Sequence, residues 1–139
     1  MGSITQEDID FLRASALDAS GGVARLCLHS DPSALQHDMV VALTTGCQQR
    51  IHRHPEKPET LHVIEGTLTV SLFNDDGVLL RREFLSRDQQ LLTRIPSGVW
   101  HLVQPDTEVS IFHESRPGPF DRLADAEFAL WTVGETDKV

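Results

Sequence analysis

The chain has 139 residues, with 12 Lys and Arg against 21 Asp and Glu, and a formal net charge of −9 at pH 7. This length fits one domain that buries its own core without disulfides. The negative charge argues against a nucleic-acid partner, which needs a basic face. No stretch approaches the roughly 18 apolar residues of a membrane span, and the polar N-terminus does not resemble a signal peptide. We therefore expect a cytoplasmic protein that binds neither nucleic acid nor membrane.

Residues 1–22 are expected to form a short helix that packs on the rest of the chain. Thr5 and Asp8 have the spacing of a capping box, and Gly21 and Gly22 end the pattern. Apolar residues recur at helical spacing at Ile9, Leu12, Ala16 and Ala19. A partner helix or a lid is the alternative interpretation.

Residues 23–133 follow a different pattern, of short strands. Turn signals recur roughly every eight to twelve residues, which predicts an all-β sandwich or barrel in a single domain. The segment Asn74-Asp75-Asp76-Gly77 is a hairpin signal, because these residues tolerate positive φ. Residues 134–139 are expected to be a frayed tail. The predicted strands are 23–29, 38–43, 49–52, 60–64, 67–73, 79–84, 90–95, 101–103, 108–114 and 128–132.

The central part of the chain has the residues of a metal site. His52 and His54 are two positions apart, so on a strand both imidazoles leave the same face. Glu59 begins the next apolar run, and His101 lies on a later predicted strand. Three imidazoles and one carboxylate suit one divalent ion of Zn, Fe, Mn, Ni or Cu. Glu56 is the alternative acid, although the spacing to the following glycine favours Glu59.

The ligand set contains no cysteine, which favours an open, functional site over a closed structural one. Cys27 and Cys47 lack metal-ligand spacing, and reduced thiols are expected. The formal charge of the site is +1 when a divalent ion is bound by one carboxylate and three neutral imidazoles. Such a pocket favours an anionic group on its ligand.

Other polar residues have weaker signals. Arg25, Cys27 and His29 share one face of a predicted strand. Arg25 and His29 are therefore candidates for binding a substrate, with an exposed sheet face or a dimer contact as an equal alternative. His37 has polar neighbours and is expected at the surface, whereas His113 is a strand-end residue that could line the interior.

The spacing of the central segment resembles the cupin superfamily. Its first motif is Gly, five residues, His-x-His, three or four residues, Glu, six residues, Gly, and its second is Pro-x-Gly-x-x-His. The chain satisfies the first with Gly46, His52, His54, Glu59 and Gly66, and the second with Pro96, Gly98 and His101. It departs from the second motif at Gln90, where Gly is usual, and at Pro105, where Asn is usual.

This resemblance implies an all-β, single-domain cupin fold, a double-stranded β-helix or jelly-roll barrel with a short N-terminal α-helix. It also implies that His52, His54, Glu59 and His101 are the metal ligands. Segments such as Arg25–Ser30 further resemble the WbuC-type cupins, small metalloproteins associated with bacterial surface polysaccharides. A homodimer is expected on the same resemblance.

The function predicted is a small metal-dependent enzyme, such as an isomerase, lyase or oxygenase, that acts on a polar or anionic small molecule. The resemblance implies that this molecule is sugar-derived. A non-catalytic module that binds a carbohydrate or another small ligand is the alternative, because one cupin ligand set supports both. A catalyst usually needs an acid–base group beyond the ligands. The sequence offers His29, His113 and Cys47 for that role.

Overall fold

The computed structural model describes residues 2–131, so the predicted tail 134–139 and the end of the last predicted strand lie outside the described residues. One helix precedes ten strands along this part of the chain. The elements are α1 (Gln6–Asp18), β1 (Val23–Cys27), β2 (Gln36–Thr44), β3 (His52–Arg53), β4 (Glu59–Glu65), β5 (Leu68–Phe73), β6 (Leu79–Leu85), β7 (Leu92–Ile95), β8 (Trp100–Pro105), β9 (Val109–Pro117) and β10 (Glu127–Phe128).

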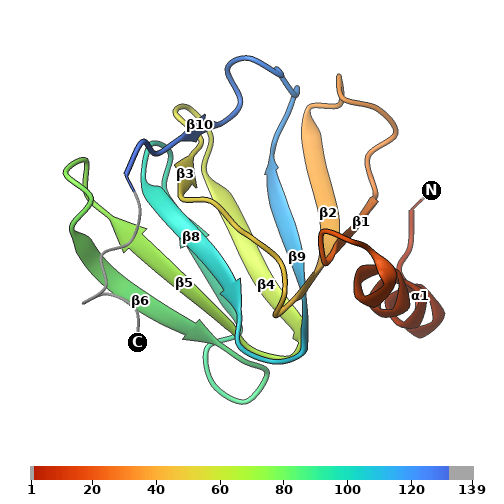
Figure 1. Ribbon diagram of the computed structural model, residues 1–139. Helices are drawn as coiled ribbons and strands as arrows, with labels where there is room; N and C mark the ends of the chain where they lie inside the picture. Colours follow the sequence, from red (N-terminus) through yellow and green to blue (C-terminus); the bar gives the residue numbers. More distant parts are fainter. Residues whose placement is uncertain (1, 132–139) are drawn as a thin grey trace.

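The strands form two five-stranded antiparallel sheets, with strand orders β1-β2-β9-β4-β7 and β10-β3-β8-β5-β6 (Figure 1). Neighbours in the sheets are mostly distant in sequence, as in a jelly roll. The predicted all-β cupin fold with one short N-terminal helix is confirmed. Within residues 2–131 the hydrogen-bonded ladders keep the two sheets separate. No helix in this range is long and apolar enough to cross a bilayer.

The main core lies between the sheets because the strands alternate buried and exposed positions. Its buried side chains come from both sheets, and their aliphatic and aromatic groups exclude water from the interior. They are Val41, Leu43, Leu61, Val63, Leu68, Val70, Leu85, Ile95, Val103 and Phe112.

The helix α1 covers the outer face of the sheet that contains β1, β2 and β9 (Figure 1). Ile9, Leu12 and Ala16 are buried there against Val40 and other apolar residues of β2 and β9. Its N-terminus has the predicted capping box, in which Thr5 and Asp8 satisfy each other's backbone N–H groups. The helix therefore packs on the sheet from outside, as the stripe predicts.

The strands were predicted in the right order, with differences at their ends. β3 is two residues long and follows a segment without regular structure, whereas the sequence predicts a strand over 49–52. The hairpin between β5 and β6 is confirmed, with Gly77 at φ 80° and the Asn74 side chain accepting two backbone N–H groups. His37 was wrongly predicted at the surface: it is buried beneath residues 32–35 and Gly118.

Candidate metal centre

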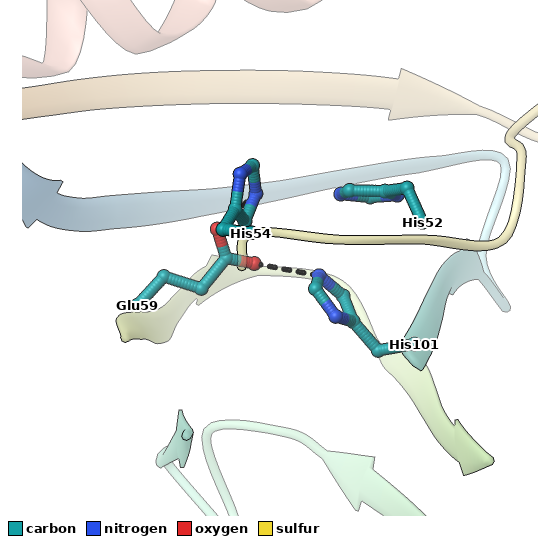
Figure 2. Close-up of side chains that lie close together, drawn as sticks. All are labelled: His52, His54, Glu59 and His101. Carbon is teal, nitrogen blue, oxygen red and sulfur yellow. Dashed lines mark ion pairs between the residues drawn. The ribbon is translucent and has the colours of Figure 1, made fainter. Parts of the chain in front are cut away.

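Four side chains from both sheets meet at one point, with one potential ligand atom of each within 4.8 Å of the others (Figure 2). His52 and His101 are direct partners across β3 and β8, so their imidazoles leave the same face. His54 follows two residues after His52, and strand alternation returns it to that face. Glu59 is the first residue of β4 and enters from the opposite sheet. Residues far apart in the chain thus face one another across the interior.

Each of the three histidines is held by a backbone carbonyl. The Nδ1 atoms of His52, His54 and His101 lie 2.9, 2.8 and 2.9 Å from the carbonyl oxygens of Arg50, Asp125 and Val99. A carbonyl can only accept, so each Nδ1 donates its proton, and in a neutral imidazole the lone pair is then on Nε2. This is the arrangement by which partner groups orient metal-binding imidazoles.

The Glu59 carboxylate lies among these imidazoles (Figure 2). Its oxygens are 3.1 Å from Nε2 of His54 and 3.0 Å from Nε2 of His101. Burial opposes ionisation of Glu59, but the contacts with His101 and His54 outweigh it and hold the pKa of this carboxyl well below its usual range. The pKa of His52 falls to about 4, chiefly because burial disfavours the charged imidazole. The site therefore contains an ionised carboxylate and, at His52, a neutral imidazole.

The residues present fit a metal ion. Glu59, His54 and His101 are 3, 4 and 1 % exposed, and among the described residues Oε2 of Glu59 and Nε2 of His101 are buried without a hydrogen-bond partner. The Nε2 atoms of His54 and His101 face the oxygens of Glu59, and a cation between neutral imidazoles and this carboxylate would satisfy both. Ligands bound at about 2.1 Å and at right angles are about 3.0 Å apart, close to the distances from Glu59 to the two imidazoles.

A cavity of about 600 Å³ opens beside the cluster. His52, His54 and Glu59 line it, while His101 lies behind them in the interior. A large part of the cavity wall is apolar and is formed by side chains of the core between the sheets. These apolar residues are Met39, Val41, Leu43, Leu61, Val103 and Phe112. A small molecule in this cavity would have direct access to three of the four clustered side chains.

Sequence reasoning missed two cavity-lining residues on β9, Glu114 and Arg116. Phe112, Glu114 and Arg116 alternate along the strand and line the cavity. Burial, together with the negative charge and hydrogen bond of Glu59, raises the pKa of Glu114 to about 8. The sequence contains a signal for them: Glu114 and Arg116 follow the buried Phe112 at two-residue intervals, so on a strand they leave the same inward face. Polar residues at such positions indicate a site.

Asp125 was missed as well, and it connects the site to the segment between β9 and β10. Its side chain is 5 % exposed and forms ion pairs with Lys57 and with Arg116, the latter at 3.2 Å. Its backbone oxygen accepts the Nδ1 proton of His54. A guanidinium nitrogen of Arg116 lies 3.0 Å from Nε2 of His54, alongside the ring. This network holds His54 in place.

The structure separates the remaining candidates. Arg25 lines the cavity. His29 lies outside the cavity lining and stacks on His37, with ring centroids 3.9 Å apart. His113 projects to the other face of β9 and contacts Asp38 at 2.7 Å. Cys47 packs against the core, where burial raises its thiol pKa. Of these residues, only Arg25 is placed to contact a ligand in the cavity.

Solved structures with similar folds come from several proteins. The capsular polysaccharide assembling protein CapF of Staphylococcus aureus superposes with a TM-score of 0.65 at 18% identity, over 76% of this chain and 29% of its own. An oxalate decarboxylase of Lactobacillus farciminis gives 0.60 at 19%, over 80% and 32%. Protein SO0799 of Shewanella oneidensis gives 0.64 at 16%, over 86% and 83%.

These neighbours are cupin-fold proteins, and at such identities the likeness extends to the fold alone. The chain spans about a third of the length of CapF and of the oxalate decarboxylase. No curated protein sequence shows a significant match. A family model described as a domain of unknown function (DUF6016) matches residues 4–85, which is more than half of the chain. The chain therefore belongs to the DUF6016 family, and its fold is that of a cupin.

Proposed function

We propose that the protein binds one divalent transition-metal ion through His52, His54, Glu59 and His101, and that it is a small metal-dependent enzyme acting on a polar or anionic molecule. The convergence of the four potential ligand atoms, with Oε2 of Glu59 and Nε2 of His101 buried without a hydrogen-bond partner among the described residues, carries this proposal. Buried acceptors of this kind are stabilised when a cation satisfies them together.

The cavity supports a catalytic role. A divalent ion in the cluster would supply Lewis acidity toward a bound water or carbonyl group. The chain's own residues would exclude water with the apolar wall, orient the ligand, and carry a proton. Glu114 is placed for the last of these tasks, because its carboxyl lies against Glu59 and lines the cavity. Glu114 thus takes the acid–base role for which the sequence offered His29, His113 and Cys47.

A non-catalytic binding module is the second candidate function, since the same cavity could hold a ligand without converting it. A cytoplasmic location, expected from the sequence, belongs to the proposal, and a sugar-derived substrate, implied by the resemblance, is the alternative to an apolar ligand body. Relation to the WbuC-type cupins and a homodimer belong to it as well. The resemblance of the sequence motifs supports them.

Metal binding is tested by elemental analysis of purified protein, followed by equilibrium dialysis of the metal-free protein against Zn²⁺. We expect about one ion per chain in the wild type and most of the affinity lost in His52→Ala. His62→Ala is the matched control, because His62 is an exposed histidine on β4 outside the cavity. Equal affinity in all three proteins would exclude the proposed site.

Catalysis is tested by incubating metal-loaded protein with a bacterial metabolite extract and comparing the small molecules by mass spectrometry. An enzyme depletes one compound and accumulates another, and both changes disappear in His52→Ala. Glu114→Gln should keep the metal and lose turnover. A compound that the wild type binds and releases unchanged would identify a binding module instead.

A further inference from the structure

Positive charge is concentrated around the cavity although the whole chain has a formal net charge of −9. Four arginines line it, against three carboxyl side chains, Glu59, Glu114 and Asp125. Two of these carboxyls are already engaged: Glu59 belongs to the metal cluster, and Asp125 pairs with Lys57 and Arg116. The arginines are Arg25, Arg50, Arg116 and Arg122.

Three of the arginines remain available to a ligand. Arg25, Arg50 and Arg122 are exposed, and the ion pairs formed within residues 2–131 include none from these three. The guanidinium of Arg50 lies 4.1 Å from the centre of the Phe128 ring, a cation–π contact that holds it beside the cavity. Arg25 comes from β1, Arg50 from the segment before β3, and Arg122 from the segment between β9 and β10. Three arginines from distant segments, without an ion pair among the described residues, thus line one cavity.

Part of the cavity wall behind these arginines is apolar. The apolar part of the wall is formed by side chains of β2 together with Leu61, Val103 and Phe112, and the exposed Phe120 and Phe128 extend it. Besides the arginines and the metal cluster, the polar side chains at the cavity are Gln48, Gln49, Glu114 and Asp125. The hydroxyls of a sugar that face this apolar part would lose water without regaining the hydrogen bonds. A hydrocarbon or aromatic group would be stabilised there.

From this combination we infer that the ligand is an amphipathic organic anion, with a carboxylate or similar group bound by Arg25, Arg50 and Arg122 and an apolar body against the wall of β2, β4 and β9. This inference rests on the proposed function in that it takes the cavity to be the ligand site. The inference favours a ligand with an apolar body over a sugar-derived one.

The test uses a matched set of probes with zinc-loaded protein in a titration calorimeter. 4-Phenylbutyrate has both features, 4-phenyl-1-butanol only the apolar body, butyrate only a short chain with the anion, and glucose 6-phosphate the anion on a hydrophilic body. We expect 4-phenylbutyrate to bind at least about tenfold more tightly than each of the others, and less tightly at high salt. Equal or tighter binding of glucose 6-phosphate would overturn the inference.

Variants locate the binding. Arg25→Gln and Arg122→Gln should each lower the affinity for 4-phenylbutyrate by about tenfold, because each removes a charge-assisted hydrogen bond. The affinity for 4-phenyl-1-butanol, which has no anionic group, should stay unchanged. Arg87→Gln is the control, since Arg87 is exposed and outside the cavity. Equal effects at all three positions would refute the arginine role.

Metal content of the same samples separates the two proposals. If zinc binds but the four probes are not distinguished, the ligand class is wrong and the metal site stands. If zinc does not bind, the proposed function is wrong whatever the probes do. If the arginine variants also lower the affinity of the metal-free protein for 4-phenylbutyrate, that result would still support the anion site.

Discussion

Gly46 and Gly66 open and close the first sequence motif, yet the structure assigns them very different constraints. Gly66 has φ 75°, and a Cβ there would lie 2.6 Å from the carbonyl oxygen of Val109 and would overlap Oγ1 of Thr107. Gly46 has no positive φ and no atom within 4 Å of its Cβ position. Replacing each by alanine therefore tests whether the close approach of β4 to β9 is as described.

The cost at Gly66 follows from two terms. A left-handed backbone costs an alanine about 1–2 kcal/mol, and moving a well-packed neighbour costs about 1–3 kcal/mol. Thr107 cannot turn away freely, because its hydroxyl accepts the Thr67 N–H and donates to the Val109 carbonyl. We expect Gly66→Ala to lower the free energy of unfolding by about 2–5 kcal/mol, a large share of the total of about 5–15 kcal/mol.

The measurement is urea denaturation followed by circular dichroism, with EDTA present so that metal binding does not contribute. Gly46→Ala should remain within about 0.5 kcal/mol of wild type. A loss below about 1 kcal/mol in Gly66→Ala, or equal losses in the two variants, would show that β4 and β9 do not approach each other as described.

Three further predictions concern the site. In metal-free protein, His52 stays neutral to about pH 4 while the unfolded chain takes up this proton near its ordinary pKa of 6.5, so its contribution to stability is lost as pH falls from 6.5 toward 4. The difference in unfolding free energy between wild type and His52→Asn, measured across that range, should move in this direction, and a flat difference would contradict it. Glu114→Gln should be as stable as wild type at pH 7 within about 1 kcal/mol, because an amide N–H can replace the carboxyl proton shared with Glu59; a larger loss in thermal denaturation would mean that Glu114 is ionised. Lys57→Met should lower zinc affinity by about 10–100-fold in dialysis, since Lys57 holds Asp125, which orients His54, and unchanged affinity would show that this network is dispensable.

The sequence by itself determined the local features of this protein. Strand alternation predicted that His52 and His54 share a face, and the capping box of Thr5 and Asp8 predicted where α1 begins. Motif spacing predicted which acid joins the histidines, and Glu59 is buried beside them whereas Glu56 is exposed. These features depend on residues within a few positions of one another, or on a pattern of spacings.

Only the tertiary structure decided what surrounds the histidines. Glu114 comes within reach of Glu59 because β9 pairs with β4, and Asp125 reaches His54 because the segment after β9 crosses back over the site. The arginines of the cavity are likewise brought together from β1 and two distant segments. Each of these contacts depends on strand register and on chain crossings over tens of residues. Short-range periodicity has no information about such pairings, since the free energy that selects them comes from burying the whole core at once.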